Sequence, residues 1–165
     1  MPYDPLTVKQ TLVSSLVSEL ARMAESAVRS AEEATGEMYV GSDRTRNRGE
    51  RGKFLESAYY LTARAKQAEE YAALARRLRE MDLSPARKAR EGALLHLREE
   101  GRDGTLRLFL APGGMGSRLE AGPFPVEVVS PDSPLGRALS GKRPAARVCV
   151  NLPAGSRSFL ILSVE

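Results

Sequence analysis

The sequence predicts an α+β protein, in which an antiparallel hairpin of two long helices precedes a small antiparallel β domain with one short helix. From Pro5 to Met81 the only proline is Pro5 itself, and glycine occurs only between Gly36 and Gly52. Beyond Pro85, short apolar segments alternate with turns that contain glycine or proline. The first pattern is typical of two helices with one break, and the second is typical of short strands.

Apolar residues recur at spacings of three and four along both predicted helices. Spacings of this kind place residues on one stripe of a helix, as in a two-stranded coiled coil. The first stripe is Val13, Leu16, Leu20, Met23, Ala27 and Ala34, and the second is Phe54, Ala58, Leu61, Ala65, Ala68, Ala72 and Ala75. We therefore predict a coiled-coil hairpin over residues 1–84, with its tip loop at about 36–53, and a β domain over residues 85–165.

The β domain is predicted from alternating apolar segments at 93–98, 105–111, 126–130, 147–152 and 159–164, with a loop at 112–116. Between the third and fourth of these lies the run SPLGRALSGK at 133–142, which predicts a short helix over one face of the sheet. Ser133 is expected to cap the first turn, and Pro134 suits the first helical position. Gly141 supplies the left-handed residue that ends such a helix.

Charge is distributed unevenly along the chain. Residues 1–85 carry 13 basic and 13 acidic side chains, whereas residues 86–165 carry 12 and 8, which accounts for the net charge of +4. This excess suits an acidic protein surface or a nucleic-acid backbone. Aromatic residues are only 5% of the chain and no dense basic stripe is present, which disfavours a dedicated nucleic-acid binder.

Other features exclude further classes of protein. No apolar segment is long enough to span a bilayer, so we expect no membrane partner. The single cysteine, Cys149, excludes an internal disulfide and fits a reducing, cytoplasmic compartment. The only histidine, His96, alternates with leucines in a strand pattern, and no group of residues has zinc spacing.

The helix run and the segment after it carry a resemblance to a known family. SPLGRAL, then Gly141-Lys142, then the strand and turn from Val148 to Gly155 together resemble the C-terminal domain of the bacterial Gre-type transcription elongation factors. The match is strongest over residues 125–165. It implies a fold like that of the FK506-binding proteins (FKBP-like) for the C-terminal domain.

The resemblance also implies a function. A Gre factor binds bacterial RNA polymerase at the secondary channel and inserts its hairpin tip toward the active centre, so it assists the polymerase and is not itself an enzyme. By this resemblance we expect a monomeric, cytoplasmic polymerase-binding regulator that needs no cofactor of its own. The docking residues are then expected to be Ser133, Pro134, Leu135, Gly136, Arg137 and Lys142.

The tip departs from the family pattern. In Gre factors two tip carboxylates help to hold a second Mg²⁺ within the polymerase complex, and the matching positions here are Asn47 and Glu50, with Asp43 as a substitute. Positive charge nearby disfavours bound Mg²⁺, so we expect little stimulation of transcript cleavage. Guanidinium groups at the tip would instead suit carboxylates or phosphates, including those of nascent RNA. The basic tip residues are Arg44, Arg46, Arg48, Arg51 and Lys53.

Two alternatives stay open at this point. Helix capping and core packing alone would explain Ser133, Pro134, Leu135, Leu139 and Gly141, which leaves the basic residues Arg137, Lys142 and Arg143. The hairpin would also suit a coiled-coil adaptor or dimerisation module that does not engage RNA polymerase, since its alanine-rich stripe fits another helix pair.

Overall fold

The computed structural model describes residues 4–40, 48–113, 115–152 and 155–165. Over these residues, helices α1 (Pro5–Val40) and α2 (Arg48–Arg79) precede a six-stranded sheet that carries the short helix α3 (Pro134–Leu139). The predicted α+β class is therefore confirmed. In this part of the chain, no helix combines the length and the apolar character needed to cross a membrane.

The chain divides into two compact units. One is Val17–Arg76, and the other joins Met1–Leu16 to Arg77–Glu165. In this division, both ends of the helical segment group with the strands. The domain boundary at residue 84 stays a prediction. Each unit is described separately below.

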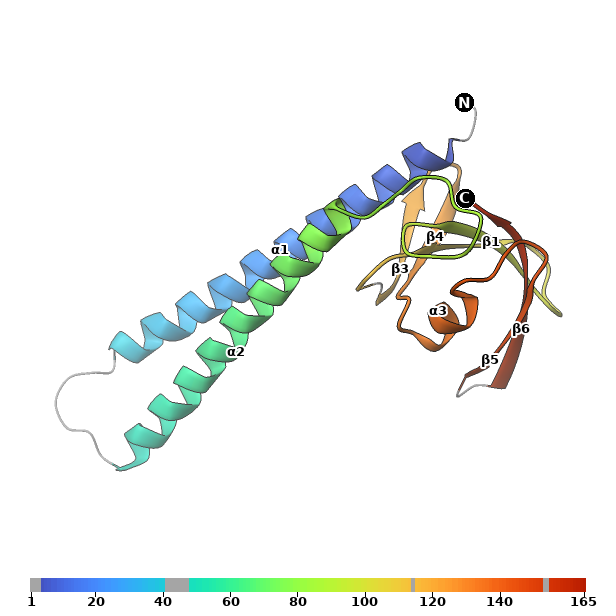
Figure 1. Cartoon of the computed structure of the whole chain (residues 1–165). Helices are drawn as coiled ribbons and strands as arrows, with labels where there is room; N and C mark the ends of the chain where they lie inside the picture. Colours follow the sequence, from blue (N-terminus) through green and yellow to red (C-terminus); the bar gives the residue numbers. More distant parts are fainter. Residues whose placement is uncertain (1–3, 41–47, 114, 153–154) are drawn as a thin grey trace. The chain divides into compact units, whose positions relative to one another are not determined.

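In the unit Val17–Arg76, α1 and α2 run antiparallel, side by side (Figure 1). Of the predicted stripe of α1, Leu20 and Ala27 are buried and Met23 is half-buried in this unit. On α2, four residues of the predicted stripe are buried or half-buried, namely Ala58, Leu61, Ala68 and Ala75. Ala65 and Ala72 are exposed, and the adjacent Arg64 and Tyr71 are half-buried in their place.

The polar side chains of the α2 stripe form a hydrogen-bonded ladder. Arg64 Nη1 donates to Gln67 Oε1 at 2.9 Å, and Gln67 Nε2 donates to the Tyr71 hydroxyl at 2.9 Å. Long side chains of this kind cover apolar surface with their stems, whereas alanine covers little. At these two positions the longer side chains therefore replace the predicted alanines in the stripe.

Helical backbone extends farther toward the tip than the sequence predicts. The expected loop at about 36–53 assumes that Gly36, Gly49 and Gly52 interrupt the helices, but α1 continues to Val40 and α2 begins at Arg48. A glycine inside a helix costs only about 1 kcal/mol relative to alanine, and no proline lies in this segment to break the helix.

The sheet consists of β1 (Leu94–Glu99), β2 (Leu106–Leu110), β3 (Met115–Ala121), β4 (Phe124–Val129), β5 (Arg147–Leu152) and β6 (Gly155–Val164), in the order β3-β4-β2-β1-β6-β5. All neighbours are antiparallel except β2 and β4, which are parallel.

Strand β3 is missing from the sequence prediction, which places a loop at 112–116 and no strand between that loop and residue 126. β3 is an edge strand, and its middle carries Ser117, Arg118 and Glu120. Edge strands are commonly polar because this discourages pairing with other chains. The alternating apolar signal that reveals a strand is therefore weak here.

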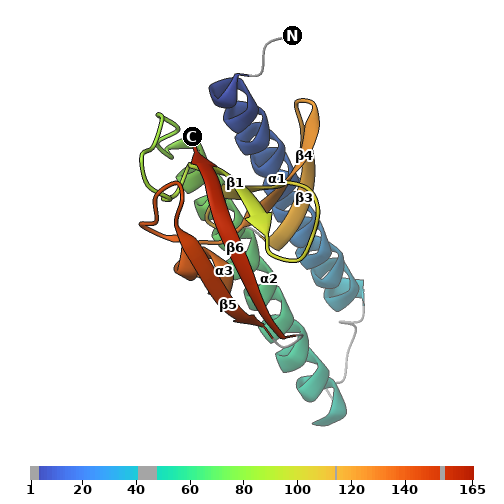
Figure 2. The same ribbon diagram turned by 90° about the vertical axis from the view of Figure 1, so that its right-hand side faces the viewer.

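Helix α3 contacts β5 and covers one face of the sheet (Figure 2). The core on this face takes alternate residues from the central strands, including Leu95, Leu108 and Ile161, together with Leu139 of α3. Residues of the opposite register, such as Leu94 and Phe109, are also fully buried. The sheet thus buries both faces and holds α3 in a fixed position.

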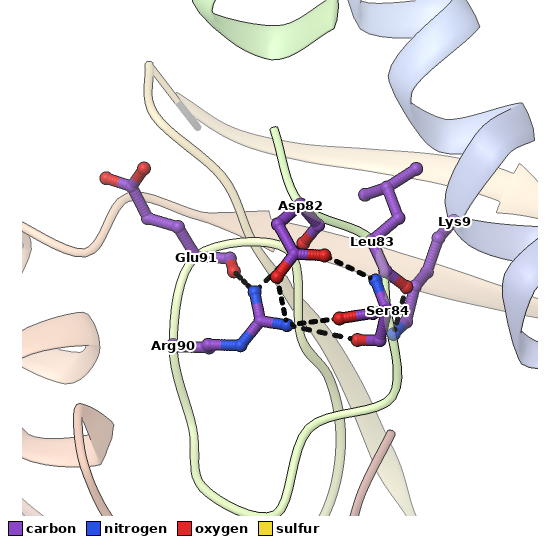
Figure 3. A network of polar contacts seen from close by, with 6 residues as sticks. All are labelled: Lys9, Asp82, Leu83, Ser84, Arg90 and Glu91. Atoms are coloured by element: carbon purple, nitrogen blue, oxygen red, sulfur yellow. Dashed lines mark hydrogen bonds and ion pairs between the residues drawn. The ribbon is translucent and has the colours of Figure 1, made fainter. Parts of the chain in front are cut away.

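Arginine 90 organises the segment that leads from α2 into the sheet (Figure 3). Its guanidinium donates to the Asp82 carbonyl at 2.9 Å and to the Ser84 hydroxyl at 3.0 Å, and it pairs with the Asp82 carboxylate at 2.9 Å. The amide of Ser84 also donates to the Asp82 carboxylate, at 2.9 Å. These contacts fold residues 82–90 into a closed loop.

Lys9 of α1 binds the same loop through its side chain. Its side chain is 1% exposed, and Nζ donates to the Leu83 carbonyl at 3.2 Å (Figure 3). Burial lowers the pKa of Lys9 and the positive charge of Arg90 adds to this effect, while Glu165 and Asp82 oppose it. Because a buried cation needs partners, Lys9 ties the first turns of α1 to the loop.

An ion pair between β1 and β6 gives a first testable prediction. Arg157 donates twice to Glu99, from Nε and Nη2, each at 2.6 Å. These hydrogen bonds lower the pKa of Glu99, the charges of Arg157 and Arg102 act in the same direction, and burial opposes them. The pair therefore stabilises the fold fully above the ordinary glutamate pKa of 4.5, and this stability is lost as the pH falls through the lowered pKa.

We expect Glu99→Gln to melt about 2–4 °C below the parent protein at neutral pH. The difference should shrink as the pH falls below the lowered pKa of Glu99. Circular-dichroism melts across that range would measure it, with the exposed Glu120→Gln as the matched control. A difference that stays constant on acidification would contradict the role given to this pair.

Candidate docking surface at helix α3

Helix α3 begins and ends as its sequence predicts. The Ser133 hydroxyl accepts a hydrogen bond from the Gly136 amide at 3.0 Å and donates to the Ser130 carbonyl at 2.7 Å. Pro134 occupies the first helical position, and Gly141 follows with a φ of 77°. Both ends are thus determined locally, by residues within the motif itself.

Gly136 is required by a close backbone approach. A Cβ at this position would lie 2.0 Å from the Ser130 carbonyl oxygen and 2.8 Å from the Cα of Pro131. On the same side of the helix, Leu139 is fully buried and Leu135 packs partly against the core. Three of the predicted docking residues, Ser133, Leu135 and Gly136, therefore have structural roles and position the helix.

The other three predicted docking residues reach the surface. Pro134, Arg137 and Lys142 are exposed, as is the next residue, Arg143. Within the described residues, the side chains of Arg137, Lys142 and Arg143 have no ion-pair partner. The structure therefore brings the predicted set together on one short helix and the residues that flank it, and separates the set into a packed and an exposed half.

The linker between α2 and β1, in which the sequence predicts no functional residue, lies against the end of α3. The Ala89 amide donates to the Lys142 carbonyl at 2.8 Å, and the Gly141 amide donates to the Ala89 carbonyl at 2.7 Å. Sequence reasoning missed this segment as part of the surface. The available signal is the spacing of Ala86 and Ala89 among charged residues, which is typical of a segment with one side against a core.

The predicted tip residues cannot be placed in the same way. Asp43, Arg44, Arg46 and Asn47 lie outside the described residues. Arg48, Glu50, Arg51 and Lys53 lie on the backbone of the first turns of α2, and their side chains lie outside the description. Where side chains are described, no group of three or more His, Cys, Asp or Glu residues is placed to hold a metal ion.

Comparison with known structures gives several similar proteins, among them the following three. The GreA factor homolog 1 (Gfh1) of Thermus thermophilus is 18% identical, with 93% of this chain and 94% of that chain covered and a TM-score of 0.39. The Gfh1 of Thermus aquaticus is 17% identical, with 90% and 92% covered and a TM-score of 0.37. The elongation factor GreA/GreB from Nitrosomonas europaea is 18% identical, with 57% and 78% covered and a TM-score of 0.37.

Because these scores are low, the family assignment depends on the sequence of the C-terminal segment. No curated protein sequence matches this chain. Residues 118–165 match the family model described as "Transcription elongation factor, GreA/GreB, C-term". This segment contains β4, α3, β5 and β6, and with them the SPLGRAL motif that carries the resemblance. Residues 118–165 of this chain are therefore similar to the C-terminal domain of the GreA/GreB transcription elongation factors.

Proposed function

We propose that this protein regulates transcription elongation by binding bacterial RNA polymerase through the exposed side of α3. The observation that carries the proposal is the family match over residues 118–165, which includes the whole of this helix. Packing accounts for the buried residues of the motif, but it does not account for the exposed Arg137 and Lys142. Exposed cations without partners suit an acidic surface on another protein.

The helical hairpin suits the delivery of its tip to a distant site. Helices of 36 and 32 residues extend about 50 Å at 1.5 Å per residue. Two helices of this length cannot enclose a core of their own. Their length therefore extends the distance that the tip can span more than it stabilises the fold. We propose that the hairpin enters the secondary channel of the polymerase, as the resemblance to Gre factors implies.

We propose further that the tip changes polymerase behaviour with little stimulation of transcript cleavage. From Asp43 to Lys53 the chain carries five basic and two acidic residues, and Asn47 stands where the family pattern has a carboxylate. An amide provides an oxygen ligand without charge, and the excess of arginine repels Mg²⁺. The same arginines suit phosphate or carboxylate groups near the nascent RNA.

Stalled, backtracked elongation complexes test this proposal for the tip. We expect the wild-type protein to add little Mg²⁺-dependent shortening of the RNA, and Asn47→Asp to raise it several-fold because a second carboxylate can then hold the ion. The RNA length would be followed on gels over time. Rapid shortening by the wild-type protein that Glu50→Ala abolishes would contradict the proposal.

Retention on core RNA polymerase tests the proposal for docking. We expect the wild-type chain to be retained on immobilised core polymerase, and the double variant Arg137→Glu/Lys142→Glu to be lost from it. Light scattering after size exclusion would report the oligomeric state of both proteins, which we expect to be monomeric. A stable dimer without retention would overturn the proposal and favour a coiled-coil adaptor.

A further inference from the structure

We propose that the linker segment supplies a second half of the docking surface, so that Arg87 and Lys88 act together with Lys142 and Arg143. We call these four residues the basic linker surface, and we infer that it binds a cluster of carboxylates on the surface of RNA polymerase. The inference rests on the proposed function, because it names the chemistry of the partner surface that lies next to α3.

The linker turns its two charged residues away from the protein. Ala89 is only 2% exposed and belongs to the core cluster, and Ala86 packs partly against the same cluster. Arg87 and Lys88 lie between these two anchors, and both are exposed. Their outward orientation is thus imposed by the packing of their neighbours.

Backbone hydrogen bonds hold both halves of the surface next to each other. The reciprocal bonds from the Ala89 amide to the Lys142 carbonyl and from the Gly141 amide to the Ala89 carbonyl join the linker to the end of α3. The Lys142 amide also donates to the Leu139 carbonyl, at 3.0 Å. A partner would therefore bind cations whose backbone is already ordered, which reduces the entropic cost of association.

The four cations have no acidic partner within the described part of the chain. Two neighbouring arginines do have partners, since Arg90 pairs with Asp82 and Arg77 with Glu91. None of the four residues of the basic linker surface forms an ion pair there. Like charges on two segments that are joined by backbone hydrogen bonds repel one another, so their arrangement does not serve the stability of the isolated protein. A partner that carries carboxylates would relieve the repulsion.

A protein partner fits this surface better than a nucleic acid does. Proteins that bind single strands combine basic grooves with aromatic side chains on which bases stack. The segments that carry the four cations, 85–92 and 140–146, contain no aromatic residue. The four charges also lie on two short segments, whereas a duplex is bound by a longer basic stripe.

Binding kinetics at two salt concentrations test the inference with the full-length chain and core RNA polymerase. The variants are Arg87→Gln/Lys88→Gln and Lys142→Gln/Arg143→Gln. The control, Arg98→Gln/Arg118→Gln, removes two exposed charges from β1 and β3. At low salt we expect each surface variant to weaken binding about tenfold, mainly through a slower association rate, and the control to change little. At high salt the differences should shrink, because screening weakens exposed charges.

Three results would overturn the inference. If the wild-type chain binds polymerase and Arg87→Gln/Lys88→Gln binds as tightly as the control at low salt, the linker plays no part in docking and the proposed function stands. If the linker variant instead loses affinity for a 20-nucleotide RNA and keeps its affinity for polymerase, the surface binds nucleic acid. If the wild-type chain does not bind polymerase at any salt concentration, both the inference and the proposed function fail.

Discussion

Gly136→Ala is expected to destabilise the protein by about 3 kcal/mol, because its new methyl group would overlap backbone atoms. The added Cβ would lie 2.0 Å from the Ser130 carbonyl oxygen, and this atom cannot rotate away as a side chain could. Alanine would otherwise favour a helix by about 1 kcal/mol over glycine. Helix propensity and close packing therefore predict opposite signs, and urea unfolding followed by circular dichroism distinguishes them.

The exposed side of the same helix provides the control for this substitution. Arg137→Ala lies one residue farther along α3 and faces solvent, so we expect its unfolding free energy to stay within about 0.5 kcal/mol of the parent value. Gly136→Ala should also weaken binding to polymerase, since α3 would shift from Ser130. An unchanged or increased stability of Gly136→Ala would show that the helix packs less closely than described.

Gly92→Ala is expected to have an effect of similar size, for two reasons that add. Gly92 has a φ of 81°, a conformation that costs a residue with a side chain about 1–2 kcal/mol. Its Cβ would also lie 2.2 Å from the Asp82 carbonyl oxygen, so the loop held by Arg90 would have to move. We expect a total loss of about 3 kcal/mol, together with faster tryptic cleavage at Lys88 and Arg90.

Gly101→Ala separates these two contributions. Gly101 has nearly the same φ, 80°, but nothing lies within 4 Å of a Cβ built there. This variant should therefore lose only the conformational contribution of about 1–2 kcal/mol and keep the linker resistant to trypsin. Equal losses of unfolding free energy for Gly92→Ala and Gly101→Ala would mean that the close approach to Asp82 does not affect stability.

The sequence predicts those parts of the fold that local interactions determine. Both ends of α3 follow from Ser133, Pro134 and Gly141, and each of these acts on residues close to it in the chain. Strand β3 does not follow, because an edge strand needs no apolar alternation and carries Arg118 and Glu120 instead. Two positions of the α2 stripe do not follow either, since a choice between Ala65 and Arg64 depends on packing against α1.

The candidate site divides in the same way. Arg137 and Lys142 could be selected from the sequence, since neither capping nor core packing explains a cation at those positions. Arg87 and Lys88 could not, because their place beside α3 depends on a backbone pair between Ala89 and residues about fifty positions later. The sequence alone also does not reveal why position 136 must be glycine, because the close approach to the Ser130 carbonyl is seen only in the folded structure.

Site-specific photo-crosslinking from α3 to polymerase tests the central claim most directly. A photoreactive amino acid at the exposed Ser140 would leave Arg137 and Lys142 intact, and the same group at Glu120 of β3 provides the control position. In mixtures with core RNA polymerase, we predict crosslinks to a polymerase subunit from position 140 and far fewer from position 120. Crosslinks from position 140 only to a second copy of this chain, or equal yields from both positions, would contradict docking through α3.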